Sequence, residues 1–322
     1  MRFGVFTPQG WRGDLNDIQD PVDQFEAMIN VAKVADSLPT LDSVWVYDHF
    51  HTIPTPQLMT TFECWTATTA LARATSRVHV GQMVGCNGYR NPALYAKIAS
   101  TVDVASHGRL YAGIGAGWYE HEWRAYGYEW NDTPVRMRKF REAVQIIHKM
   151  WTEEYPTFEG THYHIDKPIN EPKHSGKGKV PLWIGGGGEQ VTLKLVAQYA
   201  DGCNVGGGNP EVVRQKLDVL RKHCEQVGRN YDEIVKSTSI EPMVILEKEG
   251  DADSATRALR GEQSLEQYLQ RAYVGTPEQL AERLGRLAEV GATYVIVYFP
   301  RAAYDQSQIR QFAEEIIPMV SS

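Results

Sequence analysis

The sequence has few cysteines and no long apolar run, and these two shortages exclude several classes of protein. Four cysteines occur among 322 residues, without C-x-x-C spacing, which excludes a disulfide framework and a zinc knuckle. We expect small buried thiols in a reducing compartment at Cys64, Cys86, Cys203 and Cys224. No segment has about 18 uninterrupted apolar residues, and the N-terminus lacks the pattern of a signal peptide. The expected location is the cytoplasm, with no membrane partner.

Positive charge is also scarce. Lys and Arg total 33 against 40 Asp and Glu, which gives a net charge of −7. A chain with this balance has no broad basic field, so we expect no nucleic-acid partner. Hydrophobic residues make up 42% of the chain, enough to bury a large core in one big α/β domain or two ordinary ones.

Short apolar runs alternate with longer stretches of helical spacing along the whole chain. Eight runs predict strands: RFGVFT from Arg2, SVWVYD from Ser43, VHVGQMV from Val78, LYAGIGA from Leu110, PLWIGG from Pro181, GCNVGG from Gly202, SIEPMVIL from Ser239 and YVIVYF from Tyr294. Several are apolar at consecutive positions, as in parallel strands buried on both faces. Three helices carry start signals: Thr133 with Pro134, Asn209 with Pro210, and Thr276 with Pro277 and Gln279. Gly228 predicts the end of the second helix.

Eight strand-helix units over this length predict a (β/α)8 TIM barrel, an α/β fold, as a single domain over residues 1–322. Two stretches break the alternation, 152–180 and 247–275. We expect both to be insertions at the C-terminal rim, where barrel enzymes keep lids and substrate loops.

The second predicted strand runs into VYDHFHTIPTP, which places Asp48, His49 and His51 at this rim. A histidine at a strand end suits general acid-base catalysis, because its ordinary pKa lies near neutrality and an adjacent Asp can orient it. The alternative is that Asp48 caps the next helix and His49 is an exposed loop residue. A metal site is disfavoured, since residues one position apart point in opposite directions in an extended segment.

Two glycine-rich segments follow later strands. GIGAGWYEHEWRAYG, from Gly113, lacks the sixth-position Gly of a dinucleotide fingerprint, which argues against Rossmann-type binding. Small residues there would let a flat group approach the backbone, with Trp118, Tyr119 and Trp123 as apolar walls; core packing is the alternative. PLWIGGGGEQ is not a Walker loop, because Glu189 and Gln190 stand where Lys and Ser or Thr are required.

A single phosphate remains compatible with the glycine run. Gly186 and Gly187 end one predicted strand, and Gly206 and Gly207 end the next. Two such rims that each open a helix can share one anion, held by backbone N–H groups and the helix N-terminus. The alternative is that both are ordinary turns.

Taken together, these segments resemble the luciferase-like flavin and deazaflavin oxidoreductases over nearly the whole chain. The resemblance rests on the D-H-F beginning at Asp48, the R-N-P beginning at Arg90, S-x-G-R from Ser106, the G-x-G-x-G-W ending at Trp118, and PLWIGGGGEQ from Pro181. It implies a (β/α)8 barrel with an insertion after strand four, a homodimer, and either FMN or coenzyme F-420 (F420, an 8-hydroxy-5-deazaflavin) as cofactor.

The resemblance also implies roles for particular residues. Asp48 and His49 would lie beside the deazaflavin ring, with His49 as the catalytic, proton-handling group. In similar proteins, residues matching Met83 and Val84 form a non-prolyl cis peptide against the ring. The other cofactor-binding residues it implies are Ala116 and Gly117 along the ring and ribityl chain, and Gly186, Gly187, Gly206 and Gly207 at the phosphate.

The chain departs from the family members that oxidise a sugar phosphate. Those carry a Glu directly after G-x-G-x-G and a Trp shortly after D-H-F, where this chain has Trp118 and Ile53. Sugar-phosphate oxidation is therefore not expected. Trp118 and Glu122 are instead predicted to line a substrate pocket.

The leading hypothesis is an oxidoreductase that passes hydride between F420 and a small, apolar organic substrate, without a metal. One alternative keeps the fold but binds FMN, as a monooxygenase with a separate reductase as partner. A second alternative is a flavin or deazaflavin carrier without catalytic activity.

Overall fold

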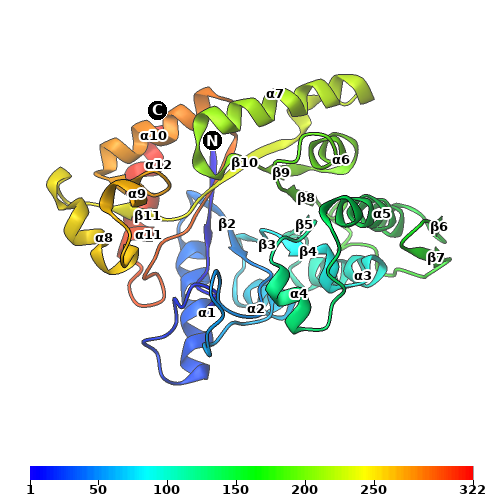
Figure 1. The fold of residues 1–322 in the computed structure, drawn as a ribbon, viewed down its shortest axis with the longest axis horizontal. Helices are drawn as coiled ribbons and strands as arrows, with labels where there is room; N and C mark the ends of the chain where they lie inside the picture. The colour runs from blue at the N-terminus through cyan, green and yellow to red at the C-terminus, as the bar shows by residue number, and fades with distance from the viewer. Residues whose placement is uncertain (322) are drawn as a thin grey trace.

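The computed structural model describes residues 1–321, and within them eight parallel strands close into a barrel (Figure 1). In order around the barrel these are β1 (Arg2–Phe6), β2 (Leu41–Val46), β3 (His79–Gln82), β5 (Leu110–Gly115), β8 (Leu182–Gly185), β9 (Gly202–Asn204), β10 (Val235–Ile240) and β13 (Tyr294–Val297). Pairing of β13 with β1 closes the ring. The short β4 (Gly85–Cys86) follows β3 and pairs with β5. The predicted TIM barrel is confirmed.

Helices surround the barrel. Within residues 1–321 the α-helices are α1 (Pro21–Ser37), α2 (Cys64–Ala74), α3 (Pro92–Ala105), α4 (Glu120–Ala125), α5 (Thr133–Thr152), α6 (Thr192–Tyr199), α7 (Pro210–Val227), α8 (Ala252–Arg260), α9 (Leu265–Leu269), α10 (Pro277–Glu289), α11 (Ser307–Gln311) and α12 (Ile317–Ser321). None of these helices is long and apolar enough to cross a membrane.

The predicted helix signals are confirmed for α7 and α10. Asn209 caps α7, and Gly228 ends it at φ 69°. Thr276 begins α10 in a capping box with Gln279. The start of α5 differs by one residue, because the Asp132 side chain accepts the capping hydrogen bond from the Val135 amide.

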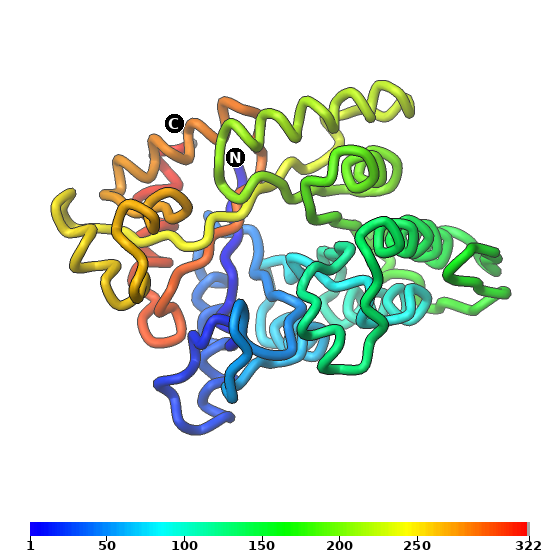
Figure 2. Tube along the Cα trace, in the orientation of Figure 1, coloured from blue at the N-terminus to red at the C-terminus, as the bar shows by residue number. Residues whose placement is uncertain are grey.

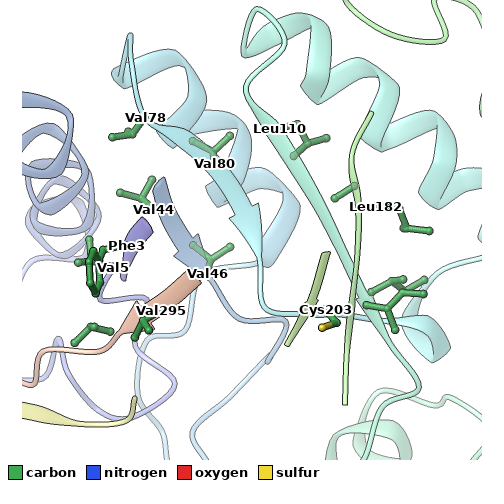
Figure 3. Packing of buried hydrophobic residues seen from close by; sticks show 14 of the residues in the cluster. Phe3, Val5, Val44, Val46, Val78, Val80, Leu110, Leu182, Cys203 and Val295 are labelled. Atoms are coloured by element: carbon green, nitrogen blue, oxygen red, sulfur yellow. The ribbon is translucent and has the colours of Figure 1, made fainter. Parts of the chain in front are cut away.

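The barrel strands are packed differently on their two faces. The outer face carries branched apolar side chains that pack against the helices, including Val44, Val80 and Val295 (Figure 3). The inner face is aromatic: Trp45 and Trp183 lie with ring centroids 5.0 Å apart. A Cβ on Gly81 of the neighbouring strand would lie 2.6 Å from the Trp45 ring. Glycine therefore makes the room that the large interior rings require.

The predicted seventh strand, SIEPMVIL, is wrong in its position. The barrel strand β10 begins earlier, at Val235, and carries the polar run VKSTSI, whose buried side chains include Ser237 and Ser239. Only its last two residues, Ser239 and Ile240, overlap SIEPMVIL. The later part of SIEPMVIL forms β11 (Met243–Ile245), which pairs with β12 (Tyr273–Gly275) outside the barrel. Hydroxyl groups that bond neighbouring strands, as Ser237 does to the Cys203 carbonyl, allow polar residues in this interior strand.

The two stretches outside the alternation lie at different places. Residues 152–180 follow α5 and lead into β8, and they contain a hairpin of β6 (Thr157–Glu159) and β7 (His164–Asp166). The end of this segment leads to the N-terminal side of β8, as expected for a connection between a helix and the next strand. Tyr163 of the hairpin, however, accepts a hydrogen bond from the Asn87 side chain at 3.5 Å, just past the carboxyl end of β4. Residues 247–275 follow the carboxyl end of β10 and contain α8 and α9, on the opposite side of the molecule from the hairpin (Figure 2).

Candidate active site

The carboxyl ends of the barrel strands surround a cavity of about 500 Å³. Its walls come from the segments that follow β1, β2, β5 and β10 and from the junction of β3 with β4. The lining residues are Trp11, Arg12, Tyr47, Asp48, His49, Ile53, Pro54, Met83, Val84, Gly85, Cys86, Tyr89, Gly117, Trp118, Tyr119 and Glu241. The sequence-predicted residues Asp48, His49, Met83, Val84, Gly117 and Trp118 are thus brought together here.

His49 is nearly buried, and its ring is held by Glu122. Its side chain is 11% exposed, and its Nδ1 lies 2.9 Å from Oε2 of Glu122. A carboxylate oxygen can only accept, so Nδ1 carries a proton, and in the neutral imidazole Nε2 is the nitrogen without one. Nε2 makes no hydrogen bond to any residue from 1 to 321. The ring therefore keeps one unshared nitrogen on the cavity side.

The Glu122 carboxylate is the centre of a small buried network. Its Oε2 also accepts a hydrogen bond from the Tyr89 hydroxyl at 2.7 Å, and its Oε1 accepts one from the Phe50 amide at 2.8 Å. Burial alone would raise the pKa of Glu122, but the hydrogen bonds from His49, Tyr89 and Phe50 outweigh it and hold that pKa below its ordinary value. Glu122 is therefore an anion at neutral pH.

The prediction that Glu122 lines the substrate pocket is wrong in position. Its side chain is fully buried and lies behind His49, outside the cavity wall. Helix α4 places it there, since Glu122 and Trp123 are the two residues of this short helix that are buried. A helix of six residues is too short to show the i, i+3 and i+4 spacing that marks a buried helix face.

Asp48 is held by Arg90 rather than acting as a helix cap. Both guanidinium Nη atoms contact its carboxylate, at 2.5 and 3.1 Å, and the Cys86 amide donates to Oδ2 at 2.7 Å. The cap of α2 is Glu63, so the capping alternative for Asp48 is excluded. Burial would lower the pKa of Arg90, yet the adjacent carboxylates of Asp48 and Glu63 raise it. This ion pair joins the segments that follow β2 and β4, and its Asp48 lines the cavity.

Aromatic rings form the walls on either side of His49. The ring centroids of Trp11, Trp118 and Tyr119 lie 5.6, 6.1 and 6.2 Å from the His49 ring. Trp118 is 63% exposed and stands at the mouth of the cavity. Trp123, which the sequence offered as a third wall, is buried against Tyr89 instead.

Arg12 and Glu241 add a charged pair to the cavity that sequence reasoning missed. Arg12 Nη2 lies 2.7 Å from Glu241 Oε2, and its guanidinium lies over the Trp11 ring at 4.2 Å. Burial would lower the pKa of Arg12, but Glu241 raises it. Glu241 directly follows β10, so the misplaced seventh strand concealed its position at the rim.

A second cavity of about 360 Å³ adjoins the first. The two share Met83, Val84, Gly117, Trp118 and Glu241. The remainder of the second wall consists of small residues: Gly115, Ala116, Gly185, Gly186, Thr192, Asn204, Gly207 and Ser239. The peptide bond between Met83 and Val84 is cis, as the resemblance implied, and lies where the two cavities meet.

The four glycines predicted to hold a phosphate are not equivalent. Gly186 and Gly207 line the second cavity, whereas Gly187 and Gly206 do not. The Gly186 amide already donates to the Asn204 carbonyl at 3.1 Å. A Cβ on Gly207 would meet nothing within 4 Å. The space beside Gly207 therefore stays open because glycine has no side chain.

His51 does not join His49 in a metal site. Its Nε2 lies 3.2 Å from Nδ1 of His121, a residue of α4. Within residues 1–321, no group of three His, Cys, Asp or Glu side chains has an arrangement that could hold a metal ion.

Residues 1–264 match the model of the family described as luciferase-like monooxygenase. The chain belongs to this family. An F420-dependent glucose-6-phosphate dehydrogenase from Microbacterium testaceum is 29% identical over 276 residues, 77% of this chain and 80% of that protein. An FMNH(2)-dependent dimethylsulfone monooxygenase from Pseudomonas fluorescens is 27% identical over 282 residues, 78% of this chain and 76% of that protein.

Solved structures of the same luciferase-like fold cover nearly the full chain. An F420-dependent secondary alcohol dehydrogenase, in complex with an F420-acetone adduct, superposes with a TM-score of 0.81 at 22% identity, over 99% of this chain and 98% of that one. A coenzyme F420-dependent tetrahydromethanopterin reductase from Methanopyrus kandleri gives a TM-score of 0.74 at 17% identity, over 98% of each chain. The family thus includes deazaflavin and flavin enzymes at similar distance from this chain.

The joined cavities fit a flavin-type cofactor. The larger cavity offers aromatic and apolar walls to a planar ring, and the smaller one offers backbone and small side chains to a chain ending in phosphate. Gly207 lines the smaller cavity, and the space that a side chain at this position would fill is open. A flavin/deazaflavin-dependent oxidoreductase is the class of enzyme that these cavities and the family support.

Proposed function

We propose that this protein is an F420-dependent oxidoreductase that transfers hydride between the deazaflavin and a small organic alcohol, carbonyl or imine. The observation that carries the proposal is the buried Glu122–His49 pair, which presents one proton-accepting nitrogen to the cavity. When bound, the deazaflavin ring supplies the hydride acceptor or donor.

Hydride transfer of this kind needs a partner that takes or gives one proton. When an alcohol is oxidised, the carbon gives up hydride and the hydroxyl gives up its proton; reduction reverses both steps. His49 Nε2 would take that proton, while the Glu122 carboxylate stabilises the resulting imidazolium through Nδ1. Because Glu122 is anionic and buried, it fixes the ring orientation in both protonation states.

The cavity walls favour a substrate without a phosphate group. Trp11, Ile53, Trp118 and Tyr119 are apolar or aromatic, and the Arg12 guanidinium is already paired with Glu241. A sugar phosphate would find no unpaired cation among these residues. We therefore assign a compact, largely apolar substrate rather than the sugar phosphate named for the Microbacterium relative.

An FMN-dependent monooxygenase is the second candidate, favoured by the likeness to the dimethylsulfone monooxygenase. Its flavin would activate oxygen and would require a separate reductase. A carrier without catalytic activity would need neither His49 nor its partner Glu122.

Turnover assays separate the three possibilities. The purified protein is mixed with oxidised F420 and a panel of alcohols, or with reduced F420 and a panel of ketones, enones and imines, and the deazaflavin absorbance is followed. Consumption of F420 that depends on one substrate class is expected. Oxygen-dependent product formation with reduced FMN, and none with F420, would contradict the proposal. Binding of F420 without turnover across the panel would favour the carrier.

A further inference from the structure

A third cavity, of about 220 Å³, lies beyond the glycines at the end of β9. It shares Gly207 with the second cavity and runs between the start of α7 and the face of α10, two helices that lie side by side (Figure 1). Gly207 is exposed and has no side chain, so an extended ligand can pass from the second cavity to the third.

Three arginines line this third cavity, Arg271, Arg283 and Arg286, and no Asp or Glu of residues 1–321 lines it. Arg271 and Arg283 form no ion pair with any carboxylate in that part of the chain, whereas Arg286 is paired with Glu282. The groups that line this pocket therefore carry a net positive charge. Anionic groups are the ligands that guanidinium forks bind best.

The Arg283 guanidinium is held in place by uncharged groups and is not paired with a carboxylate anywhere from residue 1 to 321. Its guanidinium lies 3.8 Å from the centroid of the Tyr273 ring, and both Nη atoms reach the Ala272 carbonyl at 3.3 Å. Partial burial lowers the pKa of Arg283 because no carboxylate compensates its charge. Tyr273 in turn donates to the Gly208 carbonyl at 2.6 Å, which links the arginine platform to the glycine turn.

We infer that this cavity, termed here the arginine pocket, binds a carboxylate-bearing chain that extends from the cofactor past its phosphate. The inference rests on the proposed function, because F420 carries an acidic glutamyl chain at that end, whereas FMN stops at the phosphate. The arginine pocket would let the protein prefer F420 over FMN, because the glutamyl chain can accept charge-assisted hydrogen bonds that FMN cannot.

The test compares the affinity for F420 with its glutamyl chain and for the same deazaflavin phosphate without that chain, by fluorescence titration. The wild-type protein is expected to bind the chain-bearing form at least about tenfold more tightly, as one or two charge-assisted contacts would give. Arg271→Gln, at an exposed position where folding is insensitive, should reduce this ratio several-fold, and Arg271→Gln with Arg283→Gln should bring it near one. Higher salt should also reduce it.

Arg138→Gln is the control, because Arg138 is exposed on α5 and the substitution removes the same charge. It should leave the ratio unchanged. Equal binding of both deazaflavins by the wild-type protein, or an unchanged ratio in the double variant, would overturn the pocket assignment alone. A raised KM for an acidic substrate with unchanged cofactor affinity would assign the arginines to substrate and overturn it too. Binding of FMN but of neither deazaflavin would overturn the proposed function as well.

Discussion

The two cavities that meet at Met83 and Val84 are built by different means. Around His49, three segments form a buried network: the loop after β2, the turn after β4 and helix α4. In it Glu122 accepts hydrogen bonds from the side chains of His49 and Tyr89 and from the amides of Phe50 and His51. Around Gly207, the wall is mainly backbone and small side chains. The first arrangement positions a group that can carry a proton; the second leaves space. Under the proposed function, we therefore expect that changes in the first region affect turnover and that changes in the second affect cofactor binding.

The largest expected effect belongs to the first region. His49→Ala removes the only imidazole lining the larger cavity within residues 1–321, and should lower turnover by on the order of a hundredfold, as for loss of a general acid or base. F420 affinity, measured by titration, should remain nearly intact. Unchanged turnover would remove His49 from the reaction, and an equal loss of binding would show that the regions are not separable.

Glu122→Gln tests whether His49 depends on its partner. An amide nitrogen in place of Oε1 would face the Phe50 and His51 amides, which can only donate. In place of Oε2 it would face Tyr89 and His49, and His49 Nδ1 would then have to accept, which moves the imidazole proton to Nε2. Turnover should fall about tenfold or more, and the unfolding free energy by about 1–3 kcal/mol. His121→Gln, an exposed change near the same loop, should alter neither.

The effect of Glu122→Gln on the unfolding free energy should depend on pH in one direction. The pKa of Glu122 is lowered in the folded protein, so its contribution to stability is present above the unfolded pKa, which lies near 4.3, and is lost as the pH falls through the folded value. The difference in unfolding free energy between wild type and Glu122→Gln should therefore narrow below about pH 4. A difference that stays constant from pH 7 to pH 3 would contradict this electrostatic account.

Gly207→Val probes the second region. The new side chain enters open space in the cavity wall, so F420 affinity should fall about tenfold or more. The residue has φ 52°, and the strain should cost about 1–2 kcal/mol of stability. Gly228→Val is a matched control, because Gly228 has φ 69° and open space but ends α7 away from both cavities. Equal affinity in the two variants would return the glycine turn to a purely structural role.

Arg90→Lys should have the smallest effect. Lysine keeps the charge opposite Asp48 but cannot make the two-pronged contact of the guanidinium. We expect a loss of about 1–2 kcal/mol in unfolding free energy, with turnover reduced less than in His49→Ala. Chemical denaturation measures the first quantity. A loss of turnover as large as that of His49→Ala would show that Asp48 acts directly on the reaction.

The sequence predicted the barrel and part of the cavity because both depend on local patterns. Consecutive apolar residues mark strands buried on two faces, and strand ends gather at one rim, so Asp48, His49, Met83 and Gly117 could be placed together. The seventh strand was misplaced because Ser237 and Ser239 are polar yet buried in the barrel interior, where hydrogen bonds to neighbouring strands satisfy them.

Contacts between distant segments could not be predicted in the same way. Glu122 reaches His49 across 73 residues, and Arg90 reaches Asp48 across 42. The R-N-P element marked Arg90 without giving its partner. Gly186 and Gly187 look alike in sequence, but only the structure shows that Gly187 faces the Lys216 side chain, with its would-be Cβ 3.2 Å from that chain, rather than the cavity.

The most direct test of the account is the ratio of dissociation constants for F420 and FMN, measured by fluorescence titration on one preparation of the wild-type protein. The account predicts that F420 binds at least about tenfold more tightly than FMN, since both the ring cavity and the arginine pocket are then occupied. Tight binding of FMN with no measurable binding of F420 would contradict it.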